Sequence, residues 1–397
     1  MTMLSQQQRI FFEFLRFCIG TVQEVPSSLK GADWRVLYAM ARKQCLVGVL
    51  FDGIKRLPAD VGMDKGLLFQ WMAQNQTLRK ANARLDKAAV EVAEWFGRKG
   101  FRTCVLKGQG NALLYPPGME RTPGDIDLWV DGGDRKVVSF VRSLSPDEKV
   151  CYHHIGFPEY NGVEVEVHFR PSFLFCFRHN RRLQGYYERV MDEQFAHRVK
   201  LGEQGEIAVP KAEFNLIFQL THIFTHLMNE GIGLRQLLDY FFLLKNTDFT
   251  DNTDKFLGST DGDGFLLNTD FTDNTDRIGG NADGVDRRLL QDELRRLGLW
   301  EFAGAVMYIM KEVFGLEDNR LIVPPDVKRG RLVLKEVLEA GNFGQYDKRN
   351  WFGHSALGHN LQRLYRDMRL VRFFPAEALS EPFFRIRHFF WRKRIVR

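Results

Sequence analysis

The chain has 397 residues, a net charge of +6 with histidine neutral, 44% hydrophobic residues and 27% charged residues. This length excludes a single small module, and the composition excludes a chain that is disordered throughout. No apolar run approaches the roughly 20 residues that a membrane-spanning helix needs, and the first residues lack the basic head and apolar stretch of a signal peptide. We therefore expect a cytoplasmic protein. Five scattered cysteines without a C-x-x-C pair indicate neither a disulfide framework nor a zinc knuckle.

The charge is segregated along the chain. Residues 363–397 contain ten Lys and Arg against three Asp and Glu, whereas residues 245–286 contain ten Asp against three Lys and Arg. The excess of positive charge therefore lies in a C-terminal tail, and the net charge of the whole chain describes no single domain.

The first 100 residues predict an N-terminal helical segment. Apolar residues recur at spacings of three and four over 7–20, 33–56 and 64–99, without the alternation of a strand. Asp64 is placed to cap the last of these helices.

Residues 101–210 have the pattern of a small sheet. Short apolar or alternating runs at 103–106 and 125–130 predict strands, and the dipeptide Asn161-Gly162 predicts a tight hairpin turn between 152–160 and 163–169. In the second arm of the hairpin, valines alternate with Glu164, Glu166 and His168, so these three side chains share the opposite face. A further short strand is expected within 203–210.

Residues 211–397 predict a C-terminal helical domain with helices over 212–229, 234–245 and 287–314. The stretch 246–286 interrupts it, because the nine residues NTDFTDNTD occur at 246–254 and again at 268–276. We interpret this segment as a duplicated, mobile, solvated insertion. Its aspartates do not follow the EF-hand spacing, which argues against a calcium site.

Two carboxylates carry the strongest chemical signal. Asp125 and Asp127 are separated by one residue in a predicted strand and so lie on one face. Like charges this close favour a bound cation, and Mg²⁺ prefers a few carboxylates together with water and substrate phosphates. Glu166 is the best candidate for a third ligand from a neighbouring strand. Such a trio could hold one or two Mg²⁺ ions, with Mn²⁺ as a substitute, for phosphoryl or nucleotidyl transfer.

Residues upstream of this pair suit a phosphate. Lys107 and Gly108 end one strand before a predicted helical turn at 111–115, where backbone N–H groups and a lysine can approach an anion. Arg121 lies four residues before Asp125 and could hold a phosphate or a carboxylate.

These motifs resemble the bacterial uncharacterised nucleotidyltransferase family, a branch of the DNA polymerase β-like superfamily. The resemblance covers residues 35–240 well and the rest loosely. It rests on Leu106-Lys107-Gly108, Tyr115-Pro116, Arg121, Gly124-Asp125-Ile126-Asp127-Leu128, Glu166-Val167-His168, His222, His226 and the run from Gly231 to Asp239.

The resemblance implies an α+β fold in which a small mixed-sheet, polymerase β-like core is flanked by helical segments. In the superfamily's pattern, Gly108 matches the turn glycine, Asp125 and Asp127 the acidic pair, and Glu166 the third acid. Gln109 departs from that pattern, since serine is common at its position. The implied reaction moves a nucleoside monophosphate from a nucleoside triphosphate to an acceptor hydroxyl with release of pyrophosphate. The acceptor is left open among a sugar, a small metabolite, a protein and RNA.

Two pairs of residues, and the single residue His168, have competing interpretations. Arg235 and Asp239 share a helix face, which indicates an ion pair or, alternatively, Asp239 as the general base for the acceptor. His222 and His226 have the spacing of helical metal ligands, but core or hinge histidines are the favoured interpretation. His168 is divided between hydrogen bonding within the nucleotide site and a structural role.

The aromatic and basic tail also leaves alternatives. It could stack on nucleic-acid bases, lie on an anionic membrane, or pack as a terminal helix on the body of the protein. The corresponding rival to the enzyme is a non-catalytic binding module that keeps the fold and acts through this tail.

Overall fold

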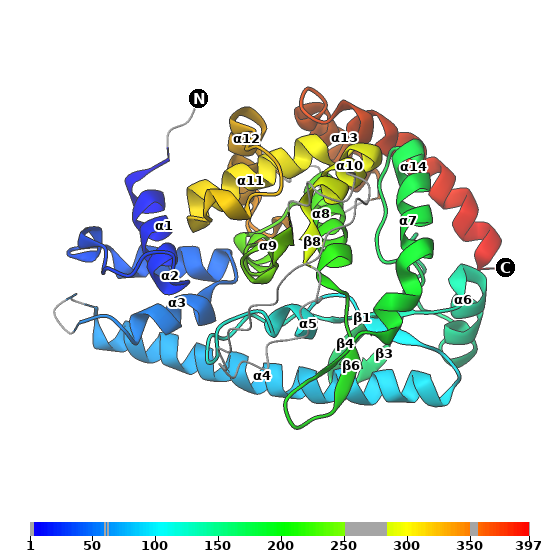
Figure 1. Ribbon diagram of the computed structural model, residues 1–397, viewed down its shortest axis with the longest axis horizontal. Helices are drawn as coiled ribbons and strands as arrows, with labels where there is room; N and C mark the ends of the chain where they lie inside the picture. The colour runs from blue at the N-terminus through cyan, green and yellow to red at the C-terminus, as the bar shows by residue number, and fades with distance from the viewer. Residues whose placement is uncertain (1–3, 59–60, 62, 251–283, 350–355, 397) are drawn as a thin grey trace, which may run out of the picture.

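The computed structural model describes residues 4–58, 61, 63–250, 284–349 and 356–396, and it has the mixed α+β composition that the sequence predicts (Figure 1). A four-stranded sheet lies between the long helix α4 (Lys65–Arg98) and the remaining helices. Helix α4 begins at the predicted cap, where the Asp64 carboxylate accepts a hydrogen bond from the N–H of Leu67 at 3.1 Å.

The sheet has the strand order β1-β2-β4-β3. Strands β1 (Thr103–Val105) and β2 (Ile126–Val130) are antiparallel, β2 and β4 (Val163–His168) are parallel, and β4 pairs antiparallel with β3 (His154–Tyr160). The small mixed sheet of the predicted fold class is thereby confirmed.

The hairpin between β3 and β4 turns at the predicted dipeptide. Asn161 and Gly162 have φ values of 53° and 72°, the left-handed backbone that this turn needs. An irregularity between Phe157 and Tyr160 then shifts the register by one residue, so that His154 lies opposite His168.

The sheet has one apolar and one polar face. The alternating apolar residues of β2 and β4 join a hydrophobic cluster with α4 and α6 (Gly133–Leu144). Asp127, Glu166 and His168 occupy the intervening positions, so they face away from that cluster.

The N-terminal helices differ in one respect from the prediction. Helix α1 (Gln6–Cys18) agrees with it, but the predicted helix over 33–56 is two helices, α2 (Trp34–Lys43) and α3 (Val47–Ile54). The break lies at Cys45, whose φ of 56° no α-helix accommodates.

The C-terminal half is an assembly of helices. The predicted helices over 212–229 and 234–245 are present as α8 and α9. The predicted helix over 287–314 is instead two helices, α10 and α11, which are separated at Gly298, whose backbone is left-handed. Helix α7 and strand β5 have no counterpart in the prediction. The remaining elements are α5 (Gln109–Ala112), α7 (Phe177–Ala196), β5 (Arg198–Lys200), β6 (Glu206–Ala208), α8 (Ala212–Asn229), α9 (Leu234–Asn246), β7 (Phe249–Thr250), β8 (Val285–Asp286), α10 (Arg287–Leu297), α11 (Trp300–Phe314), α12 (Val327–Ala340), α13 (Ala356–Leu370) and α14 (Pro375–Ile395).

The ends of the predicted insertion meet. Strands β7 and β8 pair in parallel, with Phe249 opposite Val285. Residues 251–283, including most of the repeated sequence and the aspartates considered for calcium, lie outside the described residues.

Helix α14 runs along the outer edge of the molecule (Figure 1). Phe384 and Trp391 pack on Tyr152, with ring centroids 4.8 and 5.5 Å away. The carboxylate of Glu377 accepts hydrogen bonds from the N–H groups of Phe175 and Cys176 at the start of α7. One face of the tail is therefore part of the fold. Within the described residues, no helix is long and apolar enough to cross a membrane.

Candidate functional site

The site is built on the two parallel strands at the centre of the sheet. Asp127 of β2 lies directly opposite Glu166 of β4, so the two carboxylates stand side by side on the polar face. Asp125 precedes the first residue of β2 and lines the same pocket as Asp127.

A lysine and a histidine hold Asp127. The Lys107 ammonium lies 2.7 Å from Asp127 Oδ1, and Nε2 of His168 donates to the same oxygen at 3.0 Å. The side chain of Asp127 is only 1% exposed. Burial alone would raise the pKa of Asp127, but Lys107 and His168 outweigh burial and lower it well below its ordinary value.

The pKa values of both partners of Asp127 are raised. Burial alone would lower the pKa of Lys107, but Asp127 and Asp125 outweigh burial and raise it. Burial would likewise lower the pKa of His168, but hydrogen bonds to Asp127 and Glu166 raise it to about 9. Both groups are therefore cations at neutral pH, and together they neutralise a buried acidic centre.

Asp125 and Glu166 differ in their electrostatics. Burial raises the pKa of Asp125, and the charge of Asp127 raises it further. Burial would also raise the pKa of Glu166, but His168 and His154 outweigh it and lower the pKa. Of the three acids, Asp125 is therefore the one whose negative charge is not fully balanced by its neighbours. A bound cation would supply that balance.

Two further histidines adjoin these acids. His154 places Nδ1 3.2 Å from Oε2 of Glu166 and 3.2 Å from Nε2 of His153. Burial lowers the pKa of His154 to about 4 and that of His153 well below its ordinary range, so both rings are neutral at pH 7. The sequence analysis did not select either residue. The sequence feature that could have identified them is the pair of histidines at the start of the first arm of the hairpin, opposite Glu166-Val167-His168.

The loop after β1 forms one wall of a pocket. Gly108 has a φ of 60° and caps the short helix α5, while Gln109 turns away and donates to Asp86 on α4. The pocket is open to solvent on one side. It is lined by Lys107, Gly108, Asn111, Arg121, Gly124, Asp125, Asp127, Gln219, His222, Ile223, Arg235, Gln236, Asp239 and Phe343.

With this geometry established, comparison with known proteins is informative. A family model described as "Uncharacterised nucleotidyltransferase" matches residues 30–261, more than half of the chain. The chain belongs to this family. Neither the curated proteins nor the solved structures give a match.

The uncharacterised nucleotidyltransferase family supports transfer of a nucleotide as the general activity, and an enzyme that uses a nucleotide as substrate. The matched range contains the whole four-stranded sheet and every residue that lines the pocket except Phe343. Helices α10 to α14 lie beyond it.

Asp239 pairs differently from the prediction. Its carboxylate accepts hydrogen bonds from Nε and Nη2 of Arg121, both at 2.8 Å, and from the Tyr115 hydroxyl at 2.6 Å. Arg235 instead donates to the carbonyls of Thr122 and Pro123. The predicted Arg235–Asp239 ion pair is therefore wrong, because Arg121 reaches Asp239 from a distant part of the chain.

Asp239 is a poor proton acceptor in this arrangement. Burial alone would raise its pKa, but Arg121 outweighs burial and lowers the pKa below its ordinary value. Both carboxylate oxygens already accept charge-assisted hydrogen bonds. The geometry thus gives Asp239 the task of orienting Arg121.

The two histidines of α8, His222 and His226, contact each other edge to face, with ring centroids 4.2 Å apart and an interplanar angle of 68°. Nε2 of His222 lies 3.3 Å from the Lys107 ammonium, and His226 pairs with Glu230. Neither belongs to a group of three metal-ligating side chains in the part of the chain that the structure describes.

Proposed function

We propose that this protein is a Mg²⁺-dependent nucleotidyltransferase with a polymerase β-like core. It transfers a nucleoside monophosphate from a nucleoside triphosphate to an acceptor hydroxyl, and pyrophosphate leaves. The observation that carries this proposal is the register of Asp127 with Glu166 on adjacent parallel strands, beside Asp125, in a chain of the nucleotidyltransferase family.

The acidic residues suit a divalent cation. Asp127, Glu166 and His168 offer ligand atoms that all lie within 4.8 Å of one another. Asp125, Asp127 and Glu166 supply the carboxylate oxygens that Mg²⁺ or Mn²⁺ prefers, and two ions are compatible with three carboxylates. Bound there, the cation would neutralise charge on the phosphoryl oxygens.

Basic residues in the same pocket suit the triphosphate. Lys107 directly precedes Gly108, and Arg121 and Arg235 line the same pocket as the acids. Nε of Arg235 is buried and has no hydrogen-bond partner within the described chain. An anionic phosphate would satisfy such a donor.

His168 and Asp239 act through other residues. His168 holds the Asp127 carboxylate in place, and Asp239 holds the Arg121 guanidinium in a fixed orientation. We assign both as positioning residues. The acceptor remains open among a sugar, a metabolite, a protein and RNA.

The test is a binding and transfer assay with all four α-labelled nucleoside triphosphates, with Mg²⁺ or Mn²⁺ and with bacterial extract as the source of acceptors. We expect Asp127→Asn and Glu166→Gln to abolish cation-dependent binding and transfer of label. The matched control is Glu164→Gln, because Glu164 lies on the same strand and is exposed to solvent. Equal activity of the two site variants and the control would overturn the proposal.

The tail supports a second candidate function, binding to an anionic membrane surface. Leu379, Phe383, Ile386 and Phe390 recur at spacings of three and four on α14 and are 58–65% exposed. Lys393 and Arg394 follow on the same side of the helix. An apolar stripe next to cations is the pattern of a helix that lies in a bilayer interface.

Vesicle co-sedimentation of the full chain tests this second function. We expect binding to vesicles that contain phosphatidylglycerol, and at least about a 10-fold loss in a Phe383→Ser/Phe390→Ser variant. Leu289→Ser on α10 is the control, since Leu289 is equally exposed at 65%. Binding to single-stranded RNA without binding to vesicles would contradict it. Vesicle binding by an Asp127→Asn variant that transfers no nucleotide would show that the two functions are separate.

A further inference from the structure

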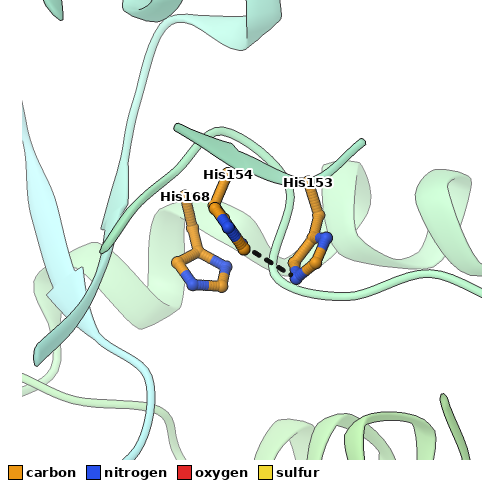
Figure 2. Close-up of side chains that lie close together, drawn as sticks. All are labelled: His153, His154 and His168. Atoms are coloured by element: carbon orange, nitrogen blue, oxygen red, sulfur yellow. Dashed lines mark hydrogen bonds between the residues drawn. The ribbon is translucent and has the colours of Figure 1, made fainter. Parts of the chain in front are cut away.

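Three imidazoles gather beside the carboxylates of the proposed nucleotide site. His154 begins β3, His153 immediately precedes it, and His168 ends β4. Figure 2 shows the three rings together, with one ring nitrogen of His168 on the side that faces the other two. The hairpin register places His154 directly opposite His168.

The distances within this cluster are those of metal ligands. Nδ1 of His154 lies 3.2 Å from Nε2 of His153 and 3.2 Å from Oε2 of Glu166. His153, His154 and His168 each offer one ring nitrogen, and these nitrogens all lie within 4.8 Å of one another. Ligand atoms around a tetrahedral ion with bonds of about 2.0–2.1 Å are separated by about 3.3 Å.

One nitrogen in the cluster, Nδ1 of His168, is buried and has no hydrogen-bond partner within the described chain. His168 as a whole is 1% exposed. Buried polar atoms of this kind normally have a partner, which can be a bound ion.

We propose that His153, His154 and His168 form a site for a borderline-soft divalent metal of the Zn²⁺ class. The ion takes the place of the proton on Nδ1 of His168, which is released, while the Nε2–H group keeps its hydrogen bond to Asp127. Imidazole nitrogens suit Zn²⁺ better than Mg²⁺, whereas carboxylate oxygens accept either ion. The metal site would adjoin the carboxylate site, because Nδ1 of His154 lies 3.2 Å from Oε2 of Glu166. This site is separate from the Mg²⁺ site of the proposed function and does not depend on nucleotide transfer.

Metal titration of the intact, chelator-stripped protein tests the site. Zn²⁺ binding is measured by calorimetry and Co²⁺ binding by visible absorption, both in excess Mg²⁺ and without nucleotide. We expect one ion of either metal per chain and a Co²⁺ spectrum typical of four-coordinate nitrogen and oxygen ligation. A wild-type protein that binds neither metal under these conditions would overturn the proposal, whatever its transferase activity.

Variants locate the ion. His153→Gln and His154→Gln are each expected to weaken Zn²⁺ binding by at least the 10–100-fold that loss of an outer partner of a metal ligand causes. His197→Gln is the control, because the ring of His197 bonds to the Val209 carbonyl away from the cluster. Circular dichroism and thermal unfolding verify that each variant is folded. Unchanged affinity in both cluster variants, or an equal loss in the control, would contradict the assignment.

Discussion

Lys107 is the residue on which the charge balance of the site depends. It is the cation closest to Asp127, and both Asp125 and Asp127 act on its pKa. Lys107→Met keeps most of the length of the side chain and removes the charge. Because it removes one of the two cations beside a buried carboxylate and leaves only His168, we expect it to lower the free energy of unfolding by about 3 kcal/mol.

A double-mutant cycle checks this prediction. Lys107→Met, Asp127→Asn and the double variant are unfolded in urea, and the double variant is expected to lose less stability than the sum of the two single variants. If the losses of stability are additive, the interaction between Lys107 and Asp127 contributes nothing to the free energy of unfolding.

Asp239 offers a second prediction at this scale. Asp239→Asn should lower the free energy of unfolding by about 3 kcal/mol, because it leaves Arg121 buried without its counter-charge. Tyr115→Phe removes only one hydrogen bond and should cost about 1 kcal/mol. If Asp239 is a positioning residue, Asp239→Asn will lower the rate of transfer but keep the acidic limb of the pH–rate profile. Loss of that limb would instead identify Asp239 as the general base.

Local patterns and distant pairs were not equally predictable from the sequence. The face shared by Asp127 and Glu166 follows from alternation along strands, a period-two rule that each segment carries by itself. The Arg121–Asp239 pair joins residues 118 positions apart, and only the packing of α9 against the loop before β2 brings them together. A rule about residue spacing within one helix cannot show that Asp239 pairs with Arg121 and not with Arg235.

The β3–β4 hairpin shows the same limit for a whole element. Its turn was predictable from Asn161-Gly162, but a regular two-residue turn would pair Ile155 with His168. The irregularity before Tyr160 pairs His154 with His168 instead and moves His154 onto the polar face. The histidine cluster therefore depends on a bulge that the sequence does not announce.

The α13–α14 hairpin carries a pH-dependent contact. Burial and the carboxylate of Glu381 raise the pKa of Asp367 to about 8, against the opposing charges of Arg385 and Arg363. The folded chain thus keeps a proton that the unfolded chain releases near pH 4. Stability is therefore fully present below about pH 4, falls as pH rises toward 8, and is level above it.

Hydrogen exchange in α14 between pH 5.5 and 8.5, corrected for intrinsic rates, measures this effect. We expect protection to decrease as pH rises in the wild type and to be nearly independent of pH in Asp367→Asn. The control is Asp292→Asn, an exposed residue of α10 that pairs with Arg295. A wild-type slope that survives in Asp367→Asn would assign the titration to another group.

At the scale of the whole molecule, the residues that the structure describes form two hydrophobic clusters that do not follow the order of the sequence. One joins α1–α3 to the C-terminal helices, and the other surrounds the apolar face of the sheet with α4 and α6. Helix α1 bonds directly to α11, since Nε of Arg16 donates to the Val313 carbonyl at 3.3 Å. The proposed boundary at residue 100 thus stays a prediction, because α4 contributes to both clusters.

Paired core substitutions test whether the two clusters unfold separately. Phe14 of α1 is fully buried in the first cluster, and Val141 of α6 is fully buried in the second. Phe14→Ala should cost about 3–5 kcal/mol and reduce hydrogen-exchange protection in α11 while β2 and β4 stay protected. Val141→Ala should do the reverse. If each substitution instead lowers protection equally in α11 and in the sheet, the chain unfolds as one cooperative unit, and the nucleotide site would then share the stability of the helices around it.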